Sequence, residues 1–331
     1  MKLFVLALLG MAFCAASCMC PSSSSVAAGE GVRVSRLEDR IRVEIHGQLF
    51  TEYHFKNVPR PFCYPLLGPQ GVPMTRHWPM RDAPGETHDH PHHRSFWFAH
   101  GLVNGHDFWS EQKEFGRIVQ AALLDARSGR DSGFIRTSNL WISADGKVQC
   151  ADVRTLRVDA KPETERLFDF EITLHACNGD VVFGDTKEGT LALRVNETMR
   201  VKPNPANEGK SPGRILTSTG ARDAEAWGTR AAWCDYSGLV EGRTVGVAIF
   251  DHPQNPRHPT WWHVRDYGLF AANPFGRHDF ERLADAHAGD LRIAAGQSVT
   301  FRYRIYVHEG DAQQARVAER YAEYVKTEQR P

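Results

Sequence analysis

The sequence predicts an all-β protein: one large antiparallel β-sandwich with a C-terminal α-helix. Apolar residues alternate with period two along most of the chain, and hairpin turn pairs separate the alternating runs. The strand–helix–strand rhythm of a parallel α/β fold does not occur. Large β-sandwiches reach the length of this 331-residue chain as single units, so we expect residues 31–331 to form one domain.

Two runs illustrate the strand pattern. "RIRVEIH" at 40–46 and "SVTFRYRIYV" at 298–307 each place every second, apolar side chain on one face, as half-buried antiparallel strands require. The Asp-Gly pair at 145–146 and the Asn-Gly pair at 178–179 mark hairpin turns, because these pairs tolerate positive φ.

A helix is predicted over residues 311–329. Asp311 can cap its first turn, and Gln314 follows three residues later, as in a capping box. We expect this helix to cover an edge or an end of the sheets. Its apolar stripe comprises Val317, Ala318, Tyr321, Tyr324 and Val325.

Residues 1–20 have the layout of a signal peptide: a basic Lys2, an apolar run at 3–13, and then small residues. Ala15-Ala16-Ser17 before Cys18 is similar to a bacterial lipobox, so lipid anchoring at Cys18 and simple cleavage both stay open. Residues 21–30 are small and polar and show no periodicity, which predicts a flexible tether. The protein is therefore expected to be exported, periplasmic or at the cell surface, and to meet a membrane only through the Cys18 anchor.

Charge and cysteine content exclude several classes of protein. Forty basic and forty acidic residues balance, without a local basic run, so nucleic acid is not an expected partner. Four cysteines remain beyond the signal region, and no CxxC pair indicates a zinc knuckle or a dense disulfide scaffold; one bridge stays open. These cysteines are Cys63, Cys150, Cys177 and Cys234.

The stretch "ETHDHPHHRSFWFAHG", Glu86 to Gly101, holds five of the sixteen histidines. It follows a strand-poor segment, Pro59 to Pro91, that we expect to form loops over one face. Three interpretations of this stretch stay open: a metal site, a proton-transfer site and a solvated loop. A divalent metal would be held by His88, His90 and His92, although the pattern is not HExxH. The apolar run at 96–98 anchors the segment in a core and favours an ordered site.

Three further stretches combine reactive and aromatic residues. They are "FGDTKEGTLALRV", "AWGTRAAWCDYSG" and "FDHPQNPRHPTWWHVRDYGLFAANPFG". In the last, alternation places Trp261, His263, Arg265 and Tyr267 on one face. Aromatic faces can stack on a sugar ring while imidazole and guanidinium groups bind its hydroxyls, although the same residues could also be buried core groups. No G-x-S-x-G, P-loop or dinucleotide-binding motif occurs.

These stretches also carry a resemblance. With "TRHWPM", they make the chain from Pro59 to the terminal helix resemble bacterial domain-of-unknown-function proteins labelled PmoA-like, or methane oxygenase. A particulate methane monooxygenase subunit crosses the membrane repeatedly, whereas this sequence has no apolar span after its signal, so the resemblance implies the family and not that activity. The order "H…HG…W", the length and the hairpin pattern are similar to galactose-mutarotase-like supersandwiches, in which a histidine and a carboxylate act on a sugar.

The leading hypothesis is an exported carbohydrate-active hydrolase, lyase or epimerase that needs no cofactor and acts on a carbohydrate or glycan-derived small molecule. A metal-dependent enzyme and a non-catalytic glycan-binding protein are the alternatives. His90 or His93 would serve as acid or base, with Glu86 or Glu188 as the complementary carboxylate. The catalytic candidates are His90, His93, Glu86, Glu188 and Lys187. The substrate-binding candidates are Arg94, His100, Asp185, Asp235, His252, Trp261, His263, Arg265 and Asn273.

Overall fold

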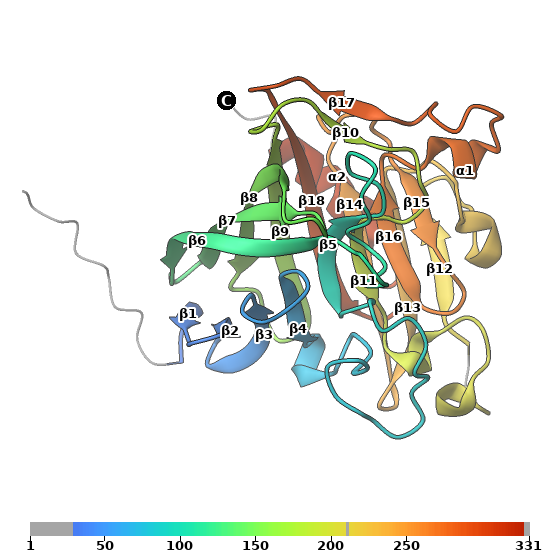
Figure 1. Ribbon diagram of the computed structural model, residues 1–331. Coiled ribbons are helices and arrows are strands. Elements are labelled where there is room, and N and C mark those ends of the chain that lie inside the picture. Colours follow the sequence, from blue (N-terminus) through green and yellow to red (C-terminus); the bar gives the residue numbers. More distant parts are fainter. Residues whose placement is uncertain (1–28, 210–211, 328–331) are drawn as a thin grey trace, which may run out of the picture.

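The computed structural model describes residues 29–209 and 212–327, and within them two eight-stranded antiparallel sheets form a sandwich (Figure 1). The predicted signal peptide, Cys18 and most of the tether lie outside these residues. Sheet I runs in the order β1 (Val32–Arg36), β2 (Arg40–Ile45), β3 (Gln48–His54), β4 (Phe62–Leu66), β5 (Phe96–His100), β11 (Gly189–Arg194), β16 (Leu269–Asn273) and β15 (Trp261–Val264).

Sheet II is the second layer. Its order is β12 (Arg214–Thr217), β13 (Trp233–Val240), β14 (Arg243–Asp251), β18 (Ser298–Glu309), β9 (Glu165–His175), β8 (Val148–Asp159), β7 (Ser132–Ile142) and β6 (Arg117–Arg127). Figure 1 shows the short pair β10 (Val181–Phe183) and β17 (Leu291–Ile293) at one end of the sandwich. The described helices are α1 (Arg277–Glu281), α2 (Val317–Thr327) and the 3-10 turns Pro69–Gly71, Glu197–Met199, Pro205–Asn207 and Asp223–Ala226.

The predicted fold class, an antiparallel β-sandwich with a C-terminal helix, is confirmed. The alternating runs at 40–46 and 298–307 coincide with β2 and β18, whose apolar residues are buried except for the half-buried Val299. Across the core, the ring of Phe96 on β5 lies 5.3 Å from that of Phe168 and 5.7 Å from that of Phe170, both on β9, in edge-to-face contact. Alternation thus gives each sheet one apolar inner face and one outer face.

The C-terminal helix is shorter than predicted. Asp311 and Gln314 form the expected reciprocal bonds, with each side chain accepting the other residue's backbone N–H. However, Arg316 adopts φ +55°, so these bonds close a separate turn, and α2 begins only at Val317. Val317 and Tyr324 pack on Trp233, Phe250 and Tyr306. The helix therefore covers the outer face of sheet II rather than an edge or an end.

Three other expectations meet the structure. β4 interrupts the segment predicted to be poor in strands, Pro59 to Pro91, and the rest of that segment, 59–61 and 67–91, is loop with one short 3-10 turn. All four described cysteines are unpaired, so the bridge left open by the sequence does not form here. Within the described ranges, no helix has the length and apolar character needed to cross a membrane.

The packing predicts the cost of a core truncation. Phe98 is 1% exposed and stacks on Phe170, with 6.0 Å between ring centroids. We expect Phe98→Ala to lower the free energy of unfolding by about 3–5 kcal/mol, because it leaves a cavity between the sheets. Val119→Ala, at a 41% exposed position, should cost about 0.5 kcal/mol or less in the same urea titration. Equal costs for the two variants would contradict this packing.

Candidate functional site

On the outer face of sheet I, small side chains form a shallow surface, which we call the floor. On β5 and β11, Phe96, Phe98, Leu191 and Leu193 point into the core, which leaves the intervening residues on the opposite face. Three of the outward residues are alanines on adjacent strands, Ala99, Ala192 and Ala271, with Ala192 directly opposite Ala271. All three are fully buried, so segments outside the sheet cover them. Small side chains leave room for the histidine-rich loop to settle on this face.

Four aromatic rings form a continuous stack over this floor. The ring of Tyr267 lies 5.1 Å from that of His90, nearly parallel, and His90 lies 4.7 Å from His93. His93 in turn stacks on Trp97 of β5 at 5.4 Å. The stack joins the loop before β5 to the turn between β15 and β16, so it fixes the directions of both imidazoles. We call His90, His93, Glu188, Arg265 and Tyr267 the histidine site.

Asp89 lies among two arginines and His90. Arg194 Nη2 donates to its Oδ1 at 2.9 Å, Arg76 Nη1 also bonds Oδ1, and Nδ1 of His90 lies 3.2 Å from its Oδ2. Burial alone would raise the pKa of Asp89, but His90, Arg194 and Arg76 hold it far below the usual range. Asp89 therefore stays ionised beside the His90 ring, whose Nδ1 makes no hydrogen bond within the described residues.

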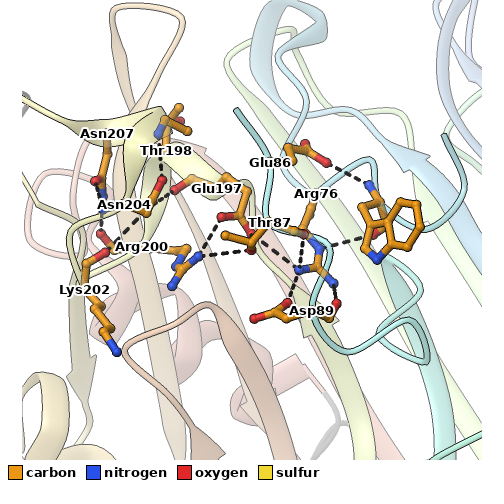
Figure 2. Close-up of polar contacts among 12 residues, drawn as sticks. Arg76, Glu86, Thr87, Asp89, Glu197, Thr198, Arg200, Lys202, Asn204 and Asn207 are labelled. Carbon is orange, nitrogen blue, oxygen red and sulfur yellow. Dashed lines mark hydrogen bonds and ion pairs between the residues drawn. The ribbon is translucent and has the colours of Figure 1, made fainter. Parts of the chain in front are cut away.

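Glu197 continues this ion network away from the site. Its carboxylate bonds Arg200 at 2.7 Å and lies 3.5 Å from both Arg76 and Arg194. Figure 2 shows Arg76 bonded to both Thr87 and Asp89, with Glu197 and Arg200 to the left of them. Arg76 and Arg194 are completely buried, so this network ties the histidine-rich loop to the end of β11.

His90 and His93 are not equivalent. Arg194 Nη1 donates to His93 Nδ1 at 3.1 Å, and an arginine can only donate, so His93 carries its proton on Nε2. Burial, with the charges of His92 and Arg194, lowers the pKa of His93 well below its usual value. His93 is thus a buried neutral ring. The His90 side chain is 39% exposed, and its backbone adopts φ +43°, a conformation that is uncommon outside glycine.

The turn before β11 brings Lys187 and Glu188 to the same face. Asn273 Nδ2 donates to the carbonyls of Thr186 and Lys187, at 2.9 and 3.0 Å, and His263 Nδ1 also bonds the Lys187 carbonyl. Burial lowers the pKa of His263 to about 4, and the bond to that carbonyl offsets the shift only in part. His263 and Asn273 therefore position this turn.

Glu188 is the second carboxylate of the site. Its side chain is 40% exposed, and Lys187 Nζ lies 3.6 Å from its Oε1. Burial raises the pKa of Glu188, while Lys187 and, more weakly, His90 oppose the shift. Burial raises the pKa of Tyr267, Arg194 and Arg265 oppose the shift, and Glu188 adds to it more weakly. The sequence-predicted residues His90, His93, Glu188, Lys187, His263 and Arg265 thus share one face of sheet I.

Several other candidates lie in structural contacts. The Glu86 carboxylate accepts the backbone N–H groups of His77 and Trp78, the latter at 2.7 Å (Figure 2). Arg94 forms a two-pronged bond to Glu111, at 2.9 and 2.8 Å. His100 points into the core, and its Nε2 bonds the carbonyl of Gly184 at 2.8 Å. None of these three groups faces the histidine site.

Asp185 and Trp261 are also engaged. Asp185 accepts the backbone N–H groups of His278 and Gly289, which holds the α1 region against the start of β11. The ring of Trp261 does face outward, but the guanidinium of Arg230 covers it at 4.5 Å, and its indole N–H donates to Glu281 at 3.2 Å. It does not offer the open stacking surface expected from the sequence.

Asp235 and His252 belong to sheet II, so the structure corrects their assignment to the same pocket. Asp235 on β13 accepts a bond from His308 on β18, with 2.8 Å between Oδ2 and Nε2, and both side chains are buried. His252 follows β14 and lies against Tyr324 of α2, at 5.4 Å between rings. Sequence alternation could not reveal which sheet each strand joins.

The proposed metal ligands do not form a cluster. His88 lies flat on Trp78 at 4.0 Å, and burial together with Arg60 lowers the pKa of His92 to about 3. Within residues 29–209 and 212–327, no three histidine, cysteine or acidic side chains are arranged to hold a metal ion.

Sequence reasoning gave no role to Arg76 and Arg194. The signal for Arg194 was nevertheless present, because the alternation of Leu191, Leu193 and Val195 turns Arg194 toward the outer face. Arg76 lies in the quoted stretch "TRHWPM", and only the folded loop brings it to Asp89.

The ion network predicts a pH-dependent stability. Because its pKa is depressed, ionised Asp89 stabilises the fold above the unfolded aspartate pKa of about 3.9, and this contribution is lost as the pH falls toward the folded pKa. We expect Asp89→Asn to cost about 2 kcal/mol at neutral pH, less than the loss of a fully buried pair because Asp89 is partly exposed. Below pH about 4, the free energy of unfolding of Asp89→Asn should fall less steeply than that of the wild type. Urea titrations at neutral pH and below pH about 4 measure the two effects. Asp82→Asn, at an exposed site, is the control variant in both.

Residues 40–322 match the model of a family described as a family of unknown function (DUF6807). No curated protein matches the chain. The resemblance to an uncharacterised family is thus confirmed, whereas the PmoA-like name is not.

Two solved structures are distantly similar. The α-galactosidase from Lactobacillus brevis has 10% sequence identity and a TM-score of 0.32, with 85% of this chain and 39% of that chain covered. The chain therefore spans less than half the length of that enzyme. The galactose mutarotase related enzyme from Lactobacillus acidophilus has 9% identity and a TM-score of 0.28, with 84% and 97% covered.

Proposed function

The chain belongs to the DUF6807 family of unknown function. From the histidine site we propose that it is a carbohydrate-active enzyme that uses acid–base catalysis on a sugar. One observation carries the proposal: two partly exposed groups with complementary proton chemistry, His90 and Glu188, share the outer face of sheet I. Paired groups in contrasting environments are typical of acid–base sites. Hydrolysis, elimination and epimerisation all require such a pair.

His90 is the proposed base. The Asp89 carboxylate beside Nδ1 favours a proton on that nitrogen, which leaves the Nε2 lone pair to accept a proton from water or from the sugar. Asp89 itself is held by Arg76 and Arg194, so the ring cannot turn freely. The neutral ring of His93 stacks on the ring of His90 and limits its movement.

Glu188 is the proposed acid. Its raised pKa keeps a larger fraction of the carboxyl protonated near neutral pH than for an ordinary glutamate. Lys187, beside it, carries a charge that can bind a sugar oxygen as negative charge develops there. Arg265, whose guanidinium contacts the ring of Tyr267 at 5.6 Å, supplies a second cation.

We also propose that this enzyme acts outside the cytoplasm. The sequence of residues 1–20 supports export, and Cys18 supports a lipid anchor. A glycan-derived substrate is available to a protein in that location.

The first test is turnover. Purified protein is incubated with a panel of oligosaccharides, and time-resolved NMR follows bond cleavage, unsaturation and epimerisation. We expect His90→Gln and Glu188→Gln each to lower kcat/KM by about 100-fold or more, because each removes a proton-transfer group. His88→Gln is the matched control, since His88 lies on Trp78 and should leave turnover unchanged. Full activity in both site variants would refute the roles, and binding without turnover in the wild type would identify a glycan-binding protein.

The second test is the pH profile. If protonated Glu188 is required, activity falls as the pH rises through its folded pKa. Lys187 lowers that pKa, so Lys187→Met should raise it and move the alkaline limb of kcat/KM to higher pH. A limb that stays in place, or moves to lower pH, would show that Glu188 is not the acid.

A further inference from the structure

Arg265 is a half-buried cation that has no polar partner for its side chain within the described residues. Its guanidinium contacts two aromatic rings, Trp227 at 5.7 Å and Tyr267 at 5.6 Å. By contrast, the neighbouring arginines Arg194 and Arg200 each have a carboxylate partner. A guanidinium has five N–H donors in a fixed plane, and no nitrogen of Arg265 is a buried donor without a partner, so these donors are open to solvent and to a ligand.

The ring of Tyr267 contacts two guanidinium groups. Arg194 approaches it at 5.0 Å and Arg265 at 5.6 Å. The charge of Arg194 is compensated by Asp89 and Glu197, whereas Arg265 forms no ion pair within the described residues. Arg265 is therefore the cation of this group that is left to bind a ligand carboxylate.

We infer that the histidine site takes an acidic sugar, a hexuronate, whose carboxylate binds the guanidinium of Arg265. The inference rests on the proposed function and adds the substrate class to it. A planar carboxylate matches the guanidinium fork with two parallel hydrogen bonds. The rings of Trp227 and Tyr267 fix the fork before the ligand arrives, which reduces the entropic cost of binding.

The same arrangement gives the sugar an orientation. Tyr267 contacts Arg265 and stacks on His90, so a carboxylate at Arg265 holds the sugar ring beside His90. Glu188 precedes β11, whose residues Thr190 and Ala192 lie on the same outer face of sheet I. Arg265 is in this account a binding residue that sets specificity, not a proton-transfer group.

The test compares ligands that differ only in charge. Ligand-observed NMR and calorimetry measure the affinities of glucuronate, glucuronamide and glucose, and of the matching galacturonate series, at neutral pH. We expect a uronate to bind about tenfold or more tightly than its neutral amide, and this preference to shrink at high salt. Arg265→Gln should abolish the preference while changing the affinity for the neutral amide less than about twofold.

Arg230→Gln is the matched control. Arg230 also lies over an indole ring, that of Trp261, but it donates to backbone carbonyls of Pro259 and Arg257 and is not part of the histidine site. It should keep the full preference. Equal binding of uronate and amide by the wild type, or an unchanged preference in Arg265→Gln, would overturn the inference and leave the proposed function standing. Tighter binding of a sulfated sugar than of the uronate would also overturn it, and binding of no sugar at all would overturn both proposals.

Discussion

The arrangement of the histidine site depends on one constraint, the compensation of two fully buried guanidinium groups. Arg76 and Arg194 are 0% exposed, and removing such a charge from water costs several kcal/mol unless a carboxylate is close by. Asp89 meets this requirement from the histidine-rich loop, and Glu197 meets it from the segment after β11. Because Asp89 must stay between the two arginines, His90 beside it is held in a fixed place.

The sandwich makes this placement possible. Each strand of sheet I gives one set of side chains to the apolar core and the other set to the outer face. On the outer face, Ala99, Ala192 and Ala271 leave a low floor, and the stacked rings from Tyr267 to Trp97 rest above it. A rigid sheet therefore carries groups that arrive from loops far apart in the chain. This is the usual division of labour between scaffold and functional loops.

Local sequence patterns predicted the features that depend only on residues close together in the chain. The alternation in β2 and β18 identified their buried faces, and the alternation through residues 261–267 put His263, Arg265 and Tyr267 on one side. The sheet that each strand joins is a long-range property, so the separation of Asp235 from the histidine site had no local signal. The late start of α2 reflects a single backbone angle at Arg316, which the capping pattern does not reveal.

The central claim is that ligand chemistry takes place between His90 and Glu188 on the outer face of sheet I. A crystal structure of the Glu188→Gln variant with a bound oligosaccharide tests it most directly. The account predicts a sugar ring on this face, with an oxygen or a ring C–H within reach of His90 Nε2 and another sugar oxygen near the residue 188 amide. A sugar bound instead on sheet II, beside Asp235 and His308, would contradict it.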